Sequence, residues 1–372
     1  MTQSITPKAC THCAKARRKC EKQRPQCLRC RTRGLRCHYP SAKPTQFVRI
    51  EEAIIPSQQH PSPLELSFPF VDESLASWWF AAPSTWTIDA PPRSLPVHRV
   101  SADLERPLRK VISWLRQWVE TGSSPLMHNS MWRECFPDSI KDAYLALSAY
   151  LHKTPLNADI VHRVIENSAK RLVAQGLVVD EDVTVNALHN LGRVQALLVY
   201  QCIGAYDGDA RLTRLTERHV PVLDAWVVVL MEQASQSLCS GSPVFAESGA
   251  KKTRNVPQQD HLWYTWILTE SVRRLWLMVA GIQGLYKVLT MDCLPASPRC
   301  MGGTMFTSRK GFWEARSAVS WEKACMERYA GLVRLTETDK MFEMVPREEI
   351  NDFAKLVLEC TYGAERCEAW GV

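Results

Sequence analysis

Residues 10–37 read CTHCAKARRKCEKQRPQCLRCRTRGLRC, in which one 11-residue cysteine pattern is written twice. Each half has two cysteines separated by two residues, followed after six more residues by a third. The six cysteines are Cys10, Cys13, Cys20, Cys27, Cys30 and Cys37. Tetrahedral zinc takes four ligands, so neither half completes a site by itself. Two zinc ions can share six sulfurs only if two sulfurs bridge both ions, and the two-fold pattern makes Cys10 and Cys27 the candidates.

In that arrangement, each zinc ion has its own group of four cysteines. The first group is Cys10, Cys13, Cys20 and Cys27, and the second is Cys27, Cys30, Cys37 and Cys10. A module of about 28 residues buries too little apolar surface to fold alone, so metal binding supplies its folding free energy. His12 and His38 lie beside ligands, but six sulfurs already complete both sites. We therefore expect these histidines to face solvent or phosphate.

Two alternatives to this arrangement are three disulfides, or a single zinc held by four cysteines with two thiols spare. Disulfides need an oxidising, secretory context, and residues 1–7 contain no apolar signal-peptide core. A single zinc leaves the doubled pattern without a purpose. A repeated cysteine pattern with this spacing therefore favours two zinc ions.

Charge is concentrated at the same end of the chain. Residues 1–50 hold 13 Lys and Arg against one acid, Glu21, and so contribute +12 to a formal net charge of +7. The other 322 residues sum to −5. Such asymmetry indicates a polyanionic partner, with nucleic acid the commonest and an anionic membrane surface the second. No apolar run approaches the roughly 20 residues that span a bilayer, so we expect no membrane insertion.

Four of the six residues between Cys13 and Cys20 are cationic, in a run compatible with a helix. The second half has Gly34 where the first has Arg17, so we expect the helix to continue past this point only in the first half. Arginine can donate two hydrogen bonds to guanine O6 and N7 in the major groove. The alternative is a solvated face or a nuclear-localisation patch. The residues expected to contact double-stranded DNA are Arg17, Arg18, Lys15, Lys19, Lys22 and Arg24.

The cysteine stretch resembles the fungal zinc binuclear cluster (Zn2Cys6) family of transcription factors. The resemblance implies two zinc ions with the first and fourth cysteines bridging, a loop shaped by Pro25, and binding of CGG-type triplets in the major groove. It assigns triplet reading to Arg17 and phosphate contacts to Lys19 and Lys22. Ala14 stands where the family usually has Arg or Lys, so one phosphate contact is expected to be missing.

A weaker resemblance extends into the rest of the chain. The stretches LGRVQALLVYQCIG from Leu191 and GGTMFTSRKGFWEA from Gly302 look like the helical regulatory regions of some fungal zinc-cluster proteins. They imply a regulatory all-α domain without identifying a ligand.

Residues 41–106 are expected to form a linker, because 11 of the 22 prolines lie between Pro40 and Pro107. No heptads occur there, so we expect no dimerisation through this segment. Residues 68–89 mix acids with aromatic side chains. These aromatic residues either recruit transcription machinery or dock into the adjacent domain, and docking is the favoured interpretation.

Helical periodicity begins at Pro107 and dominates the remainder, while strand patterns are weak. Further helices are predicted over 137–153, 158–176, 183–206, 209–239, 260–290, 309–336 and 346–361. The polar, turn-rich segment 241–257 is predicted to be a surface loop or a mobile excursion. The tryptophans of this half sit among apolar residues and are expected to be core: Trp226, Trp263, Trp266, Trp276, Trp313 and Trp321. No Walker A loop, nucleophile elbow or dinucleotide-binding glycine motif follows a predicted strand, so we expect no enzyme.

The sequence thus predicts a small Zn2Cys6 binuclear cluster module over 1–40, a Pro-rich linker over 41–106 and an all-α helical regulatory domain over 107–372. The predicted function is a nuclear, sequence-specific DNA-binding regulator of RNA polymerase II transcription that holds two Zn²⁺. The alternative is a zinc-dependent interaction module that binds acidic protein partners or RNA. A homodimer formed through the helical domain and an unidentified effector bound by it stay open.

Overall fold

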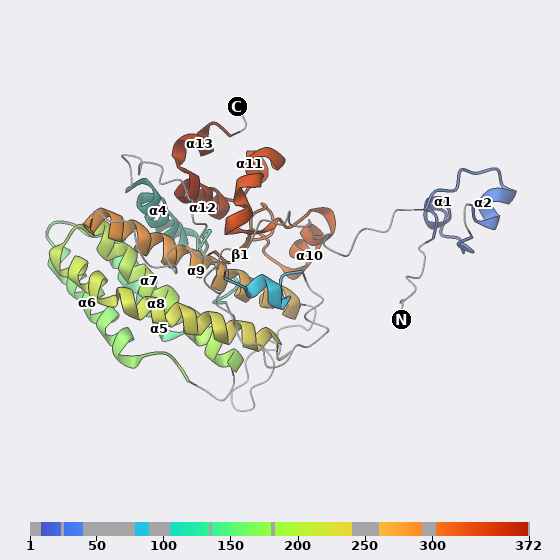
Figure 1. Cartoon of the computed structure of the whole chain (residues 1–372). Helices are drawn as coiled ribbons and strands as arrows, with labels where there is room; N and C mark the ends of the chain where they lie inside the picture. The colour runs from blue at the N-terminus through green and yellow to red at the C-terminus, as the bar shows by residue number, and fades with distance from the viewer. Residues whose placement is uncertain are drawn as a thin grey trace, which may run out of the picture. The chain divides into compact units, whose positions relative to one another are not determined.

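The computed structural model describes residues 9–23, 26–39, 79–88, 105–133, 136–179, 183–239, 260–291 and 303–370 (Figure 1). The chain forms two compact units, Met1–His60 and Pro61–Val372. Each unit has a separate core: the buried cysteines form the first, and a large apolar cluster forms the second. The expected combination of a cysteine-rich module with a mainly helical remainder is confirmed.

The N-terminal unit contains two short helices, α1 (Thr11–Lys15) and α2 (Leu28–Thr32), which begin directly after Cys10 and Cys27. Both helices end in the same way. The next residue but one adopts a left-handed conformation, with φ +48° at Arg17 after α1 and φ +66° at Gly34 after α2. The prediction that the first helix continues past Arg17 is therefore wrong. In each half the chain must reverse within six residues to return the third cysteine to the cluster, and a left-handed residue makes that turn.

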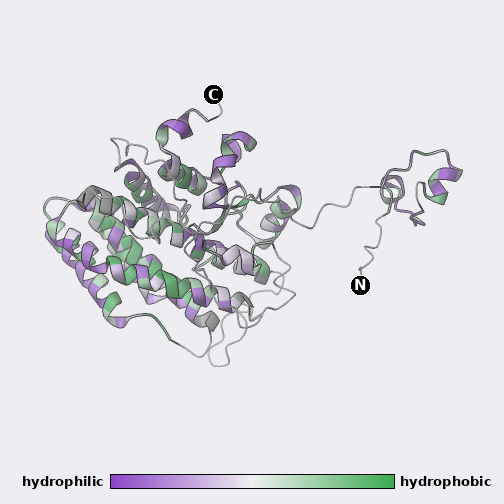
Figure 2. Cartoon of the chain, in the orientation of Figure 1, coloured by the Kyte–Doolittle hydropathy of each residue, from purple (hydrophilic) through white to green (hydrophobic). Residues whose placement is uncertain are grey.

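The second unit is built around α7 (Val183–Asp207), which contacts five other helices. Its residues Leu197, Leu198 and Val199 are consecutive and fully buried, so α7 has no solvent-facing side in this stretch. The surrounding helices are α4 (Glu105–Thr121), α5 (Asp138–Leu151), α6 (Ala158–Gln175), α8 (Ala210–Cys239) and α9 (His261–Met291). Figure 2 shows apolar residues along α7 and α8, and a mixture of polar and apolar residues on α6. The six helical runs predicted between 107 and 290 are all present, with α4 beginning two residues before Pro107.

The C-terminal part is less regular than predicted. Strand β1 (Met305–Thr307) pairs antiparallel with β2 (Leu332–Arg334). Only α10 (Ala318–Glu327) is helical within the predicted helix 309–336, which is wrong at both ends. Gly311 and Gly331 have φ values of +93° and +63° and interrupt any helix there. The remaining elements are η4 (Leu335–Lys340), α11 (Met341–Met344), η5 (Arg347–Glu349), α12 (Asp352–Tyr362) and α13 (Ala364–Glu368).

One part of the predicted linker is folded. Residues 79–88, which we call the strap, include the short 3-10 helix η1 (Pro83–Trp86) and bury Phe80 and Trp86 completely. The side chain of Arg273 on α9 donates to the carbonyl oxygen of Phe80 at 2.7 Å. Docking of aromatic residues is thus confirmed within the strap. The rest of the segment 68–89, namely residues 68–78 and 89, and the predicted loop 241–257 lie outside the described residues.

The predicted tryptophan core is confirmed, because all six of the tryptophans named above are buried. Four of them lie on α8 and α9, and Trp313 and Trp321 come from the irregular C-terminal part. Within the described residues, no helix is both long and apolar enough to cross a bilayer.

Candidate metal centre and nucleic-acid interface

The six cysteine sulfurs of the N-terminal unit come together in two overlapping groups. In each group of four, the sulfurs all lie within 4.8 Å of one another. One group is Cys10, Cys13, Cys20 and Cys27, and the other is Cys10, Cys27, Cys30 and Cys37. Cys10 and Cys27 belong to both groups, as the two-fold pattern predicts for bridging ligands. Both are fully buried.

The separations of the sulfurs fit a tetrahedral metal. The Sγ atom of Cys10 lies 3.7 Å from that of Cys27 and 3.7 Å from that of Cys30, and Cys13 Sγ lies 3.7 Å from Cys27 Sγ. A Zn–S bond of about 2.3 Å places two sulfurs of a tetrahedron about 3.8 Å apart, whereas a disulfide needs about 2.05 Å. All six cysteines are free thiols in this structure. The donor set therefore suits zinc and does not form disulfides.

Several of these thiols have shifted pKa values. Burial raises the pKa of Cys10 and raises that of Cys30 to about 12, which favours neutral thiols. A backbone hydrogen bond from Cys30 has the opposite effect on Cys27 and lowers its pKa to about 6. Zinc binds thiolates, so the charge of the metal would offset the cost of burying several of them together.

The cationic residues predicted to contact DNA surround this core. Lys15, Arg17, Arg18, Lys19 and Lys22 are all exposed. The sixth predicted contact, Arg24, lies outside the described residues together with Pro25. His12 and His38 are exposed and belong to neither sulfur group, as expected.

Two of the exposed cations have an unusual backbone. Arg17 and Lys22 have φ values of +48° and +59°, a region that is unfavourable for residues with a Cβ atom by roughly 1–2 kcal/mol. Gly34 occupies the matching position of the second half without that cost. An arginine at a position that suits glycine makes Arg17 a candidate functional residue. Arg17 and Gly34 occupy equivalent positions in the two halves of the cysteine pattern. A comparison of the halves could therefore have pointed to Arg17 from sequence alone.

Arg29 has a role that the sequence did not reveal. It is half-buried, and its Nη1 lies 3.9 Å from the Sγ of Cys13, where it donates a hydrogen bond across the two halves. Tyr39 closes the unit in a similar way, because its hydroxyl donates to the carbonyl oxygen of Gln23 at 2.7 Å.

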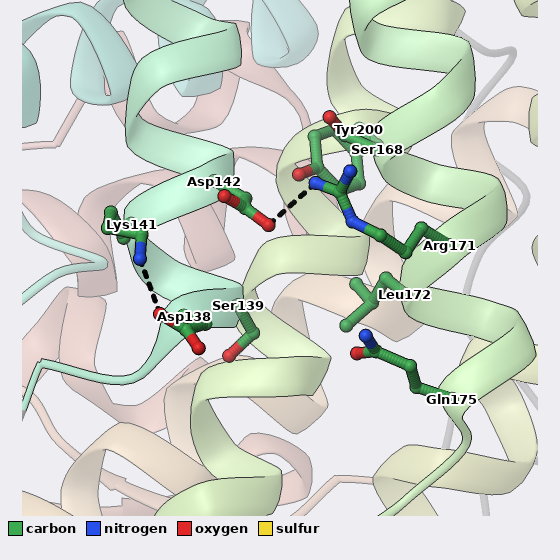
Figure 3. Close-up of a pocket in the computed structure, with 9 residues that line it drawn as sticks. All are labelled: Asp138, Ser139, Lys141, Asp142, Ser168, Arg171, Leu172, Gln175 and Tyr200. Atoms are coloured by element: carbon green, nitrogen blue, oxygen red, sulfur yellow. Dashed lines mark hydrogen bonds and ion pairs between the residues drawn. The ribbon is translucent and has the colours of Figure 1, made fainter.

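A cavity of about 360 Å³ lies between α5, α6 and α7 of the helical unit (Figure 3). Its lining is mainly polar, and an ion pair of 2.7 Å between Asp142 and Arg171 joins the two walls formed by α5 and α6. A second pair, Lys141 and Asp138, lies along α5. These pairs already satisfy the charges at the cavity, which favours a structural role.

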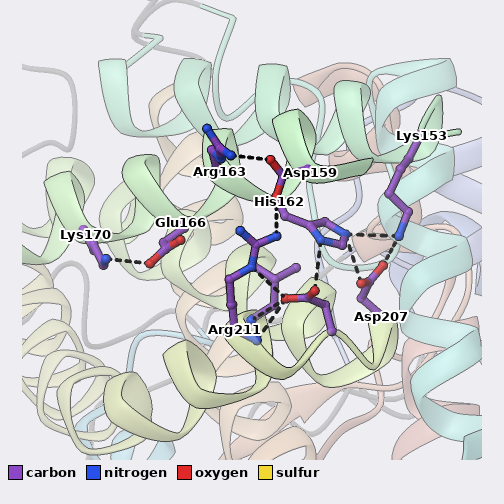
Figure 4. A network of polar contacts seen from close by, with 10 residues as sticks. Lys153, Asp159, His162, Arg163, Glu166, Lys170, Asp207 and Arg211 are labelled. Atoms are coloured by element: carbon purple, nitrogen blue, oxygen red, sulfur yellow. Dashed lines mark hydrogen bonds and ion pairs between the residues drawn. The ribbon is translucent and has the colours of Figure 1, made fainter. Parts of the chain in front are cut away.

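Polar contacts also fasten α6 to the turn between α7 and α8 (Figure 4). The ring of His162 is buried, with Nε2 3.1 Å from Asp207 and Nδ1 3.4 Å from Asp209. Lys153 contacts the same carboxylate of Asp207, and Asp209 accepts from the first backbone N–H groups of α8. The network therefore fixes the junction of three helices.

A basic unit of this size, with six sulfurs in two groups that share two members, is a zinc-cluster domain. Residues 8–46 match the Fungal Zn(2)-Cys(6) binuclear cluster domain, so the chain carries a domain of this kind at this end.

The chain is also similar to "Transcription factor gsfR2" of Penicillium aethiopicum. The two are 24% identical over 251 residues, which make up 68% of this chain and 57% of that protein. The match thus spans little more than half of the relative's length. No solved structure matches the chain.

Proposed function

We propose that the chain is a nuclear regulator of RNA polymerase II transcription that binds CGG-type triplets through a cluster of two zinc ions and six cysteines. The observation that carries this proposal is the pair of sulfur groups that share Cys10 and Cys27, in a unit whose lysines and arginines between Cys13 and Cys27 are exposed where described. Each ion would have four sulfur ligands, and the metal would supply the folding free energy of the unit. The matched family domain and the related transcription factor support the same function.

Different residues of the cluster unit would recognise the bases and contact the phosphates. Arg17 extends from the turn after α1, and its planar guanidinium suits the O6 and N7 atoms of guanine. The residues proposed to contact phosphates are Lys15, Arg18, Lys19, Lys22 and Arg24. Such contacts hold the unit on the duplex and make affinity depend on salt.

We also propose which part of the chain binds DNA and which part is regulatory. Residues 1–40 would bind DNA, and the helical unit would be regulatory. Because the strap packs on α9, the regulatory unit would take in residues 79–88 of the segment expected to be linker. A homodimer formed through the helical unit would place two clusters on neighbouring half-sites.

Replacing Arg17 and Lys22 by glycine should separate reading from positioning. Both residues are exposed and have positive φ, so glycine removes each side chain and relieves the backbone. We expect Arg17→Gly to lose affinity for a CGG-containing duplex by about 5- to 150-fold, that is about 1–3 kcal/mol, with little change on a scrambled duplex. Lys22→Gly should weaken binding to both duplexes equally and lower the salt slope by about one.

Fluorescence anisotropy with the two duplexes at several salt concentrations measures both effects. The zinc content and melting temperature of each variant should equal or exceed those of the wild type. Equal losses on both duplexes for Arg17→Gly would move Arg17 into the group of phosphate contacts.

A further inference from the structure

Helix α9 buries three charged side chains, and their charges do not balance. Glu270, Arg273 and Arg274 are at most 1% exposed. Glu270 pairs with Arg274, Oε1 to Nε at 2.9 Å, and also accepts from the backbone N–H and hydroxyl of Thr307. Among the described residues, no carboxylate lies within ion-pair distance of Arg273. Among the described residues, one buried positive charge is therefore left without a charge partner.

Arg273 has only neutral acceptors, and they occupy one of its three nitrogens. Nη2 donates to the carbonyl oxygen of Phe80 at 2.7 Å and to the hydroxyl of Thr85 at 2.6 Å. Its Nε and Nη1 are fully buried and have no acceptor in the described part of the chain. The guanidinium lies 4.9 Å from the ring centre of Trp86, and burial lowers the pKa of Arg273 to about 10. A buried donor without a protein acceptor needs another hydrogen-bond partner.

The residues around Arg273 repeat this shortage of acceptors. The indole Nε1 atoms of Trp86, Trp266 and Trp321 are buried, and no described residue accepts from them. The ring centres of Trp266 and Trp321 are 5.6 Å apart, and that of Trp321 is 6.2 Å from Phe80, the residue whose carbonyl binds Arg273. Trp266 precedes Arg273 by seven residues, two helical turns, and so lies on the same face of α9. Five buried nitrogen atoms of Arg273 and these three tryptophans thus have no acceptor among the described residues.

We propose that Arg273 and these indoles form a binding site for a small monovalent carboxylate, covered by the strap. One negative charge balances the one unpaired guanidinium, whereas a phosphate would bring an excess charge into the core. A carboxylate has two oxygens that together accept several hydrogen bonds, which matches donors arriving from an arginine and from indoles. The site is independent of the zinc cluster and of the proposed DNA contacts.

Occupancy of the site would act on the strap. Arg273 holds the strap through Phe80 and Thr85, and Arg334 also donates to the strap, at the carbonyl oxygens of Ser84 and Thr87. The strap belongs to the second unit and precedes α4 in the chain. A carboxylate that neutralises Arg273 would therefore stabilise the strap in its docked position, and a ligand that binds the folded chain raises its melting temperature.

The test is a thermal melt of the zinc-loaded full chain, refolded from urea so that any co-purified anion is removed. The probes are acetate, chloride and phosphate at equal ionic strength. We expect the melting temperature to rise with the logarithm of acetate concentration, and to rise less with chloride or phosphate. Arg273→Gln should abolish the acetate effect, whereas Arg316→Gln, the same change at an exposed arginine, should keep it.

Should Arg273→Gln fail to fold, the indole N–H resonances of the wild type provide a second readout. Acetate should shift the Trp86 resonance, assigned as the signal missing in Trp86→Phe, with a saturable dependence on concentration. Three results would overturn the proposal: no saturable shift, equal stabilisation by acetate and chloride, or an acetate effect that persists in Arg273→Gln.

Discussion

Cys27→Ser is expected to release both zinc ions and to abolish DNA binding by the whole chain. Cys27 belongs to both sulfur groups, so its loss leaves each group with three sulfurs. Zinc binding to such small domains is worth about 10–16 kcal/mol, and this free energy is also the folding free energy. The N-terminal unit of the variant should therefore be unfolded. Native mass spectrometry should count two zinc ions in the wild type and none in Cys27→Ser at the same free zinc concentration.

Cys37→Ser is the matched control, because Cys37 belongs to only one group. The group formed by Cys10, Cys13, Cys20 and Cys27 stays complete in this variant, so one zinc ion should remain. A single zinc ion in the wild type would refute the bridged cluster. The same conclusion would follow if Cys27→Ser kept one ion as firmly as Cys37→Ser does.

Glu270→Gln should be the most destabilising single substitution of a polar residue in the helical unit. The change leaves the buried guanidinium of Arg274 without its charge partner and replaces the acceptor of the Thr307 backbone N–H by a neutral amide. Breaking a buried pair by removing one partner costs about 3–5 kcal/mol, since an uncompensated charge stays in the core. Urea unfolding followed by circular dichroism should show a lower midpoint with an unchanged slope.

Glu166→Gln provides the comparison on α6. Glu166 and Lys170 have the same four-residue spacing and a contact of 2.6 Å, but both side chains are partly exposed to solvent. An exposed pair of this kind contributes about 0.3–0.5 kcal/mol. Equal losses of stability for Glu166→Gln and Glu270→Gln would show that burial does not govern the α9 pair.

The cluster could be predicted closely from sequence because its structure follows from ligand counting. Six thiols with a doubled spacing and four positions per zinc ion lead to two shared sulfurs, and the structure brings together the two groups so obtained. The helices from α4 to α9 were also predictable, because their apolar residues recur with helical periodicity over long stretches.

The predictions that were wrong share a physical cause, because the structure at these places depends on contacts between residues far apart in the sequence. The end of α1 at Lys15 depends on the return of Cys20 to the cluster, and local helix propensity does not contain that requirement. Thr307 lies in a strand whose backbone is bound by Glu270, 37 residues earlier. The strap lies in a Pro-rich segment that reads as linker, yet an arginine 193 residues later binds Phe80. Short elements held by such contacts leave little periodic pattern.

The most direct test of the proposed function is selection of DNA from a random library by the zinc-loaded full chain. We expect an enriched consensus that contains a CGG-type triplet, and its disappearance in a parallel selection with Cys27→Ser. Two enriched triplets at a constant spacing would add that the chain binds as a dimer. If the wild type enriches no motif while it binds RNA or an acidic protein with comparable affinity, the cluster is an interaction module, and the proposed reading of DNA sequence is contradicted.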